Sequence, residues 1–582
     1  MSGESFASLL VIASLLAPLV LALGVMLPST REVGMMLAPW AALPSLVLGL
    51  GTGASVHWKS VLLGMWLYSP DRVTTTYLLF TGALWLLAGL FAKGYLRGDS
   101  HRPSFWGFYL ATLAGNVGAV LAQDMASFYL FFAMMTFCAY GLVVHLRDGR
   151  AAEAARVYIV MALLGEVCLL AAFFLTAGTR INLMLAAVPR VVAESGSRDL
   201  IVVLVLLGFG VKAGALLLHM WLPLAHPVAP APASAVLSGA IIKVGVLGWL
   251  RFLPLGQASL PAVGQVCVSM GLAAAFYAVA VGLTQREAKT VLAYSSVSQM
   301  GFLTLAVGLA LGTPAASPLL VGAVLVYAVH HAMAKGLLFL GTGLLPATGP
   351  RGWGRGWVLA GLVWSALEIA GAPLTSGALA KLSLKSAEAA AQGPESLPPL
   401  LSLAAVGSTL LMVRFLMCVW AESPAHGESG VGWMAVAWGL LFAVDTALLF
   451  GTPVGREQLP HLLEPKNLVS SAWPVLVGGT VGALAWRMGR RRSWRMPRVP
   501  AGDVLWPVMR VIQPVWRLVT AGAARDSVGQ GKVSLHLQQG IERLQHLILD
   551  AVDRAEGRLS HLRQVGLALL LWLVVFLLLL IR

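Results

Sequence analysis

Two lysines lie inside long apolar stretches of this sequence, where a charged side chain is unexpected. Lys212 and Lys243 occupy two hydrophobic segments on either side of a proline-rich connection, and the whole stretch covers residues 207–251. A charged lysine at bilayer depth costs several kcal/mol unless it is paired or hydrated. Each lysine is therefore a candidate for moving protons, and a lysine whose head group reaches the membrane surface is the alternative.

The connection between the two lysines is rich in residues that interrupt helices. It contains His219 and His226, and its prolines are Pro223, Pro227, Pro230 and Pro232. Irregular backbone at membrane depth is tolerated only where protein or a water-filled cavity satisfies it. Transporters place their sites at broken helices of this kind. We therefore expect this proline-rich connection to break the helix, with the two histidines as accessory groups.

Further ionisable side chains occur in other apolar segments. Glu166 is the best counter-charge for Lys212, and a purely structural ion pair is the alternative. His331 and Lys335 are four residues apart and share a helix face, whereas His330 points elsewhere and ranks lower; a hydrogen-bonded core histidine is the alternative for His331. Burial favours the neutral amine of a lysine and a nearby acid favours the charged form, so such groups suit a proton relay. The candidate relay is Glu166, Lys212, Lys243, His331, Lys335 and Lys381, with accessory candidates His219, His226, Tyr327, Glu368, Lys385 and Asp445.

The composition indicates an integral membrane protein. Of the 582 residues, 58% are hydrophobic and 11% are charged, whereas soluble domains carry about 25% charged residues. The net charge of +15 does not indicate nucleic acid, because much of the excess lies beside apolar segments, as the positive-inside rule predicts. The first 30 residues lack a basic start and contain Glu4, which favours a retained first helix. We predict a multi-pass protein of a bacterial-type inner (cytoplasmic) membrane.

The sequence encodes no recognisable cofactor site. Its cysteines stand singly in apolar runs, at Cys138, Cys168, Cys267 and Cys418. Without CxxC or CxxCH spacing, iron–sulfur, zinc and haem sites are not expected, and no GxGxxG follows a strand. His331 has no second and third ligand at helical spacing, so we expect no metal. We therefore expect no redox chemistry in this chain.

The predicted fold is all-α and membrane-spanning. A spanning helix needs about 20 apolar residues, and we predict about sixteen such segments. A second broken helix is expected at Gly371, Pro373 and Gly377. The predicted divisions are N-terminal transmembrane helices 1–105, a first half 106–255, a second half 256–425, C-terminal transmembrane helices 426–488, a lateral amphipathic segment 489–564 and a terminal transmembrane anchor 565–582.

The lateral segment is predicted from helical periodicity. Apolar residues repeat at steps of three and four from Leu537 to Leu562, which makes one apolar stripe on a helix. Such a helix suits the cytoplasmic membrane surface. A surface helix that contacts only lipid is the alternative to one that braces other subunits.

Several stretches resemble one known family. The run HMWLPLAHPVAPAPASAVLSGAIIKVG resembles the core motif of the antiporter-like subunits of respiratory complex I, hydrogenase-4, formate hydrogenlyase and Mrp-type antiporters. The part AHPVAP…SAVLSGAIIK is most similar to the large subunit of membrane-bound hydrogenases. VYAVHHAMAKGLLFLGTG and TQREAKTVLAYSSVSQMGF resemble further motifs of the family. The resemblance covers roughly residues 70–450, and the C-terminal end more loosely.

The resemblance implies both an architecture and an activity. It implies two inverted five-helix repeats with broken helices, and a lateral helix followed by an anchoring helix. It also implies that this chain is a membrane subunit of an oxidoreductase complex. In such a subunit protons would move through a buried Glu/Lys/His relay, driven by redox partner subunits of a hydrogenase-4 or formate hydrogenlyase type. The alternatives are a subunit of an Mrp-type Na⁺/H⁺ antiporter and a membrane subunit of a proton-driven inorganic carbon uptake complex. The implied partners are other membrane and peripheral subunits, lipid, protons and, in the antiporter, Na⁺, but no nucleic acid.

The sequence departs from the family pattern in the first half. The family usually has a glutamate in its fifth helix that partners the lysine matching Lys212, and the equivalent residue here is Ala133. Asp124 is too far along the chain to replace it. Either Glu166 alone serves Lys212, or the first half-channel is altered or silent. In the second half Tyr327 replaces a histidine of several relatives, and the match at Lys381 is mixed because close hydrogenase-type relatives often have glutamate there.

Overall fold

The computed structural model describes residues 3–51, 68, 70–178, 183–349, 353–421, 431–451, 459–492 and 499–505. The chain forms two compact units, Met1–Ala501 and Gly502–Arg582. All the helices described below belong to the first unit. The predicted lateral stripe of residues 537–562 and the predicted anchor 565–582 lie outside the described residues.

The described residues form helices and no strand, with one isolated bridge between Asp124 and Met184. The first helices are α1 (Gly3–Met26), α2 (Arg31–Leu37), α3 (Leu43–Gly49), α4 (Arg72–Tyr95), α5 (Arg102–Leu121), α6 (Met125–Val143), α7 (Gly149–Ala177), α8 (Val188–Glu194) and α9 (Arg198–Ala213). The next are α10 (Trp221–Val228), α11 (Ala231–Val236), α12 (Ile242–Phe252), α13 (Pro261–Thr284), α14 (Ala288–Gly312) and α15 (Ser317–Ala347). The last are α16 (Trp353–Ala370), α17 (Ser376–Ala390), α18 (Leu397–Ala421), α19 (Val431–Gly451) and α21 (Pro465–Arg492).

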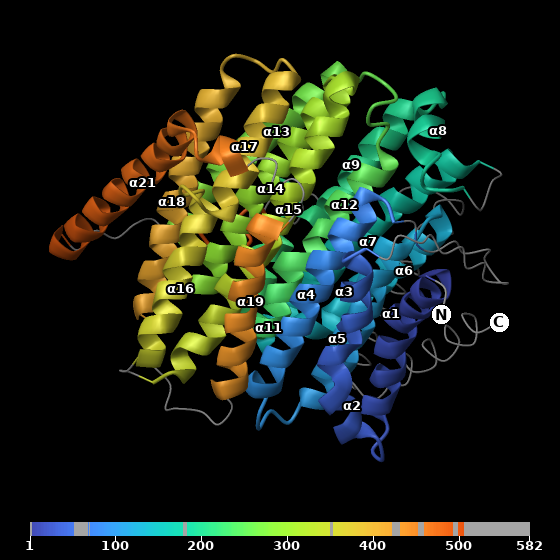
Figure 1. Ribbon diagram of the computed structural model, residues 1–582, viewed down its shortest axis with the longest axis vertical. Helices are drawn as coiled ribbons and strands as arrows, with labels where there is room; N and C mark the ends of the chain where they lie inside the picture. Colours follow the sequence, from blue (N-terminus) through green and yellow to red (C-terminus); the bar gives the residue numbers. More distant parts are fainter. Residues whose placement is uncertain are drawn as a thin grey trace, which may run out of the picture. The chain divides into compact units, whose positions relative to one another are not determined.

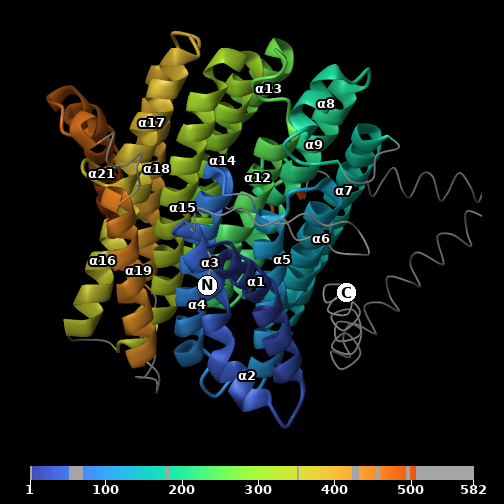
Figure 2. The same ribbon diagram turned by 45° about the vertical axis from the view of Figure 1, so that its right-hand side comes forward.

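Twelve helical stretches among the described residues are long and apolar enough to cross a membrane. This confirms an all-α, multi-pass chain. The helices of the first unit lie side by side, and the chain passes from α1–α7 through α12–α15 to α16–α21 (Figures 1 and 2). The α12–α15 region is therefore central within this unit, and it carries half of the predicted relay, namely Lys243, His331 and Lys335.

Small residues allow the central helices to approach closely. A Cβ added to Gly271 of α13 would collide with the carbonyl oxygen of Gly301 on α14, and one added to Gly308 would lie 2.7 Å from that of Gly264. In a lipid bilayer no hydrophobic force drives helices together, so they associate through close van der Waals packing, which small residues allow. The close packing of α13 and α14 holds the serine-rich face of α14 in a fixed position.

Two helices of the unit are broken by the same backbone device. Helix α9 ends before Gly214, and α16 ends before Gly371; their φ angles are +70° and +82°. Three residues further on, Leu217 and Leu374 also have positive φ, at +70° and +62°. A non-glycine residue with positive φ is uncommon and marks a constrained backbone. The broken helix predicted at Gly371 is confirmed.

Both breaks also use the same hydrogen bonds. The N–H of Ala215 donates to the carbonyl of Gly210 at 2.9 Å, and the N–H of Ala372 donates to that of Leu367 at 2.9 Å. In each case the donor lies five residues after the acceptor, as in a glycine-capped helix C-terminus. The two breaks are thus equivalent in backbone conformation and capping.

The first break lies only partly where it was predicted. The prolines of the connection do interrupt the helix, because α10 ends at Val228 and α11 begins at Ala231, with extended backbone at Ala229 and Pro230. Pro223 and Pro227, however, lie within α10 together with His226. Pro223 stands in the first turn of α10, where a missing N–H costs no intrahelical bond. The chain is irregular earlier, between Gly214 and Met220, because glycine supplies the left-handed conformation that ends α9.

Candidate functional site

Lys243 and His331 meet in the centre of the first unit. Both side chains are completely buried, and Lys243 Nζ lies 2.5 Å from Nδ1 of His331. Lys243 Nζ also donates to the backbone carbonyl of Ser238 at 2.5 Å. This carbonyl lies in a π-helical segment, Leu237–Ile241, that joins α11 to α12. Because π-bulges shift the backbone hydrogen-bond register, the local backbone can offer a carbonyl to the lysine.

Lys335 lies one turn beyond His331 on α15, so both residues face the same region as predicted. Its Nζ donates to the carbonyl of Leu292 at 2.8 Å and contacts the hydroxyl of Ser295. Both partners belong to α14. Lys335 is completely buried, and its described partners are neutral oxygens.

A serine pair connects the surroundings of Lys243 to α14. The hydroxyls of Ser238 and Ser296 lie 2.9 Å apart, and Ser296 is the neighbour of Ser295, which contacts Lys335. Lys243 and Lys335 also interact electrostatically. Helices α12, α14 and α15 therefore bring two lysines, one histidine and several hydroxyls into one buried group, which we call the central lysine group (Lys243, Lys335, His331, Ser238, Ser295 and Ser296).

Lys212 lies apart, at the end of α9. Its Nζ donates to the hydroxyl of Tyr158 at 3.1 Å and lies over the rings of Phe132 and Tyr158, at 5.7 Å and 5.1 Å from their centroids. The Tyr158 hydroxyl in turn donates to the carbonyl of Thr136 at 2.7 Å. The helices α6, α7 and α9 thus enclose this lysine with aromatic rings.

Glu166 is the acidic neighbour of Lys212. It interacts electrostatically with Lys212 and lies close to the hydroxyls of Tyr129 and Thr136. The Glu166 side chain is buried, and among the described residues it forms no ion pair as short as 4.0 Å with Lys212. Ala133 precedes Thr136 by one turn of α6, so α6 is the helix that would bring a family-type glutamate to this place.

A second polar path leaves α15 on the side of His330, the histidine that sequence reasoning ranked lower. His330 Nδ1 lies 2.8 Å from the hydroxyl of Ser376, the first residue of α17. One turn earlier, Tyr327 donates to the side-chain carbonyl of Gln299 at 2.6 Å. The Gln299 amide then donates to Ser408 at 3.1 Å. His330 therefore links α15 to the second helix break.

Lys381 lies at that break. Its Nζ donates to the carbonyl of Ala370 at 2.5 Å, and Ile369 provides a second carbonyl at 3.4 Å. These are terminal carbonyls of α16, which carry the partial negative charge of a helix C-terminus. Lys381 also interacts electrostatically with His330. Lys381 and Lys385 line a small cavity of about 60 Å³ between α17, α18 and α21.

The accessory acids Glu368 and Asp445 face each other. Each is only 2% exposed, and each is a hydrogen-bonding neighbour of the other. The indole N–H of Trp364 donates to Glu368 at 3.0 Å. Ser376 also lies close to Glu368, so the acid pair adjoins the path that leads from His330.

The other accessory residues lie in different places. His226 stacks on Phe339, with ring centroids 4.6 Å apart, and interacts electrostatically with Lys335. His219 lies near the rings of Tyr277 and Tyr294. Lys385 donates to the hydroxyl of Ser470 on α21 at 2.9 Å. Of these three, only His226 adjoins the central lysine group.

A cavity of about 590 Å³, lined by both charged and apolar residues, opens beside α7, α10 and α14. Arg150 and Glu287 line it and form an ion pair of 2.9 Å. Pro227 of α10 lies in its wall, next to His226. Lys289, at the start of α14, donates to the carbonyl of Ala229 at 2.7 Å. This cavity, which we call the mouth cavity, adjoins α10 and the start of α14.

A histidine–aspartate pair lies outside the membrane-spanning helices. His145 Nε2 lies 2.9 Å from Asp99, which also accepts from the backbone N–H of His101. Burial lowers the pKa of His145 below its ordinary value of 6.5, although Asp99 acts in the opposite direction. Burial would raise the pKa of Asp99, but the hydrogen bonds from His145 and His101 outweigh it and hold that pKa below 3.8.

Sequence reasoning missed Tyr158 and Ser376 and ranked His330 lower. All three contact or adjoin predicted relay residues. Hydroxyl groups, and a histidine on a different helix face from His331, leave no periodic pattern in the sequence. Their partners can therefore be identified only in the folded structure. No group of three or more His, Cys, Asp or Glu that could hold a metal occurs in the described part of the chain.

These features define a class of protein: a multi-pass helical membrane protein with broken helices and buried lysines and histidines joined by hydrogen bonds. Residues 122–349 match the family described as NADH:quinone oxidoreductase/Mrp antiporter, transmembrane. Hydrogenase-4 component B of Escherichia coli is 32% identical over 286 residues, which cover 47% of this chain and 42% of that protein. One subunit of the Na⁺/H⁺ antiporter of Alkalihalophilus pseudofirmus is 26% identical, over 55% of this chain and 68% of that protein. Residues 122–349 therefore match this family, and the chain is similar to antiporter-like membrane subunits.

The fold is similar to that of solved members of large membrane complexes. A chain of the Mrp complex from Dietzia sp. aligns with a TM-score of 0.64 at 22% identity, and the alignment covers 83% of this chain and 99% of that one. A chain of an archaeal membrane-bound sulfane sulfur reductase also has a TM-score of 0.64, at 20% identity and 82% coverage of this chain. The matched region spans less than half of the hydrogenase-4 component.

Proposed function

We propose that this chain moves protons across a membrane as a subunit of a complex I-like redox assembly. The single observation that carries the proposal is the central lysine group. Two completely buried lysines have neutral oxygens and one histidine as their described partners, so a charge on either is costly unless it is matched. Such a group can take up and release protons when its surroundings change, which is what coupling to a redox partner requires.

The proposed route has three parts. Water in the mouth cavity brings protons toward α10 and α14, and Lys335 exchanges them with Lys243 and His331. From α15 the route continues through His330 and Ser376 to Lys381 at the second helix break. The contacts between His330 and Ser376 and between Lys381 and the end of α16 support this part of the route.

The first half is proposed to contribute a second, weaker proton-transfer site at Lys212. Lys212 is paired electrostatically with Glu166 and bonded to Tyr158. The absence of a family-type acid at Ala133 leaves Glu166 as the group that stabilises a charged Lys212. Movement of either helix, α7 or α9, would change that interaction and so favour proton uptake or release.

The finer architecture remains part of the proposal. We propose about sixteen membrane spans, with inverted five-helix repeats in residues 106–255 and 256–425. The matching conformations and hydrogen bonds at Gly214 and Gly371 support two related halves. The divisions at 1–105 and 426–488 would then be helices added outside the repeats, and 489–564 and 565–582 would be the lateral segment and its anchor.

The partners and the membrane are proposed from the relatives. A bacterial-type inner membrane and other subunits of a hydrogenase-4-like assembly fit the similarity to hydrogenase-4 component B. A subunit of an Mrp-type Na⁺/H⁺ antiporter is the second candidate, favoured by the fold similarity to the Mrp complex and the match to an antiporter protein.

Purification of the native assembly through a tag on this chain separates these candidates. Co-purifying nickel–iron hydrogenase and iron–sulfur subunits would support the leading proposal. Small Mrp-type membrane subunits would support the antiporter instead, and a zinc-site partner would support the inorganic carbon uptake complex that the sequence left open.

Proton movement itself is tested with membrane vesicles that contain the native assembly and a pH-sensitive dye. Lys335→Met keeps an unbranched side chain, one atom shorter than lysine, and removes the amine, so we expect coupled proton movement to fall at least tenfold with the assembly intact. Lys93→Met is the matched control, because Lys93 lies at the end of α4, outside the proposed route. Equal proton movement in both variants and the wild type would contradict the proposal.

A further inference from the structure

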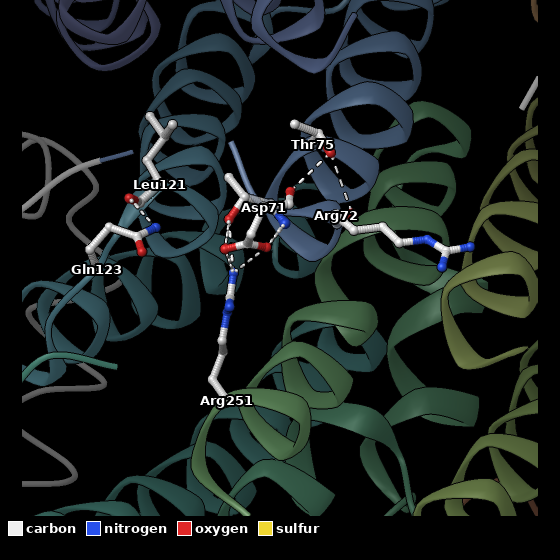
Figure 3. Close-up of polar contacts among 7 residues, drawn as sticks. Asp71, Arg72, Thr75, Leu121, Gln123 and Arg251 are labelled. Carbon is white, nitrogen blue, oxygen red and sulfur yellow. Dashed lines mark hydrogen bonds and ion pairs between the residues drawn. The ribbon is translucent and has the colours of Figure 1, made fainter. Parts of the chain in front are cut away.

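Helix α4 holds α12 at two points, although α4 precedes the part of the chain that matches the family. The first point lies where α4 begins and α12 ends. Figure 3 shows Arg251 of α12 reaching Asp71, and the guanidinium donates to the two carboxylate oxygens at 3.0 Å and 2.7 Å. Arg251 also donates to the hydroxyl of Thr74 at 2.8 Å.

The Asp71 carboxylate also forms a second interaction at the start of α4. It caps α4 by accepting from the backbone N–H of Thr74 at 2.8 Å. A carboxylate at a helix N-terminus and an arginine in the last turn of another helix both match the partial charges of those helix ends. The pair therefore fixes the start of α4 against the end of α12.

The second point lies two turns earlier on α12. The hydroxyl of Tyr77 donates to the backbone carbonyl of Lys243 at 3.1 Å, and Tyr77 is completely buried. The bond therefore acts on the main chain of the residue whose side chain contacts His331 and Ser238.

The main chain of Lys243 needs such a support. Lys243 lies two residues after the π-helical segment Leu237–Ile241, and π-helical backbone is rare because ordinary α-helical bonding competes with it. A change of register there would move Lys243 along its axis and away from His331, which belongs to another helix. A hydrogen bond from α4 to the Lys243 carbonyl opposes that movement.

We propose that Tyr77 is a positioning residue for Lys243, and that the Asp71–Arg251 pair assists it by anchoring the far end of α12. This inference rests on the proposed proton-transfer role of Lys243. It adds that α4, which precedes the matched residues 122–349, sets the distance between Lys243 Nζ and His331. Tyr77 does not carry the proton itself, because its hydroxyl bonds to the backbone and not to the amine.

The test compares two buried tyrosines that both donate to backbone carbonyls. Tyr77→Phe removes the hydroxyl from Lys243, and Tyr109→Phe removes an equivalent hydroxyl that donates to the carbonyl of Trp85. The assembly is labelled with ¹⁵N-histidine, and the His331 ring signals are assigned as those that disappear in His331→Gln. Proton movement in vesicles is measured on the same preparations.

We expect Tyr77→Phe to shift the His331 ring signals and to lower proton movement three- to tenfold. Tyr109→Phe should leave both unchanged, even if the two variants lose similar thermal stability. Identical ring signals in wild type and Tyr77→Phe would overturn the inference. The ring signals do not depend on transport. If Tyr77→Phe shows the predicted shift but the wild-type assembly moves no protons, only the proposed function is contradicted.

A second pair of variants tests the anchor. Asp71→Asn keeps a good helix cap and removes the charge that binds Arg251. Asp148→Asn makes the same change at the cap of α7, where Asp148 accepts from the N–H of Ala151 at 2.7 Å. We expect a smaller His331 shift in Asp71→Asn, in the same direction as in Tyr77→Phe. Equal His331 shifts in the two aspartate variants would show that the Asp71–Arg251 pair does not help to position Lys243.

Discussion

The two helix breaks share a backbone but differ in the side chains around it. In both, a glycine with positive φ is followed three residues later by a leucine with positive φ, and the same hydrogen bond closes the helix end. At the first break Lys212 precedes the glycine and has an acidic neighbour in Glu166. At the second, Lys381 comes after the break and bonds to the carbonyls that the break exposes.

The difference shows how one backbone device can serve two kinds of lysine. A lysine with a nearby acid is held by a pair of opposite charges, and it responds when that pair separates. A lysine on a helix C-terminus is held by backbone dipoles, which do not titrate. The second half should therefore be sensitive to the geometry of the break, and the first half to the presence of the acid.

The largest expected effect is the difference in proton movement between variants of Lys381 and Lys212. Lys381→Ala should lower coupled proton movement at least tenfold, because Lys381 ends the path that runs from the central lysine group through His330. Lys212→Ala should lower it only several-fold, since the first half lacks the family acid at Ala133. Both are measured in vesicles with an intact assembly. A greater loss for Lys212→Ala would reverse the assignment of the two halves.

Matched glycine variants test the geometry of the breaks. Gly214→Ala and Gly371→Ala both place a Cβ at positive φ, at a cost of about 1–2 kcal/mol. At Gly371 the Cβ would lie 2.7 Å from Lys381 Nζ, whereas at Gly214 it would meet the side chain of Leu222. We expect similar losses of thermal stability, but a further several-fold loss of proton movement only for Gly371→Ala. Equal proton movement would show that the position of Lys381 does not matter.

A double-mutant cycle tests the acid of the first half. Glu166→Gln should resemble Lys212→Ala in its two- to fivefold loss of proton movement, and the double variant should be little worse than either, as coupled groups require. Ala133→Glu should partly restore Glu166→Gln, because α6 already brings Thr136 close to Glu166. Strictly additive losses would mean that Lys212 and Glu166 act independently.

The smallest effect concerns stability outside the membrane. The folded pKa of His145 lies below its ordinary value of 6.5 because of burial, so its contribution is complete above that pH and is lost as the pH falls below it. Asp99 acts in the same direction at more acidic pH, since its pKa lies below 3.8. The thermal stability of the detergent-solubilised protein should therefore fall slightly as the pH is lowered from 7 to 5. His145→Gln should reduce this dependence, and an unchanged slope would exclude His145 as its source.

The helices were predictable from the sequence because their signal is local. Apolar runs of sufficient length and the glycine at position 371 predicted the spans and the second break. The prolines predicted the interruption at Ala229 and Pro230. The earlier end of α9 before Gly214 was missed because proline was given more weight than glycine. Proline is compatible with the first turn of α10, whereas the left-handed residue is the one that ends α9.

The contacts between sites were not predictable from one sequence. Lys243 and His331 are 88 positions apart, and only the packing of α12 on α15 brings them together. Tyr158 and Tyr77 act through hydroxyls on otherwise aromatic, buried side chains, which look like core residues in a sequence. The types of the relay residues could thus be proposed in advance, but their partners could not.

The central claim is that Lys243 exchanges protons within a buried group of lysines and histidine. It is tested most directly by coupled proton movement in vesicles containing the assembly with Lys243→Ala, beside wild type and Lys93→Met. The account predicts at least a tenfold loss for Lys243→Ala, with unchanged subunit composition and no loss for Lys93→Met. Proton movement at the wild-type rate in an intact Lys243→Ala assembly would contradict it.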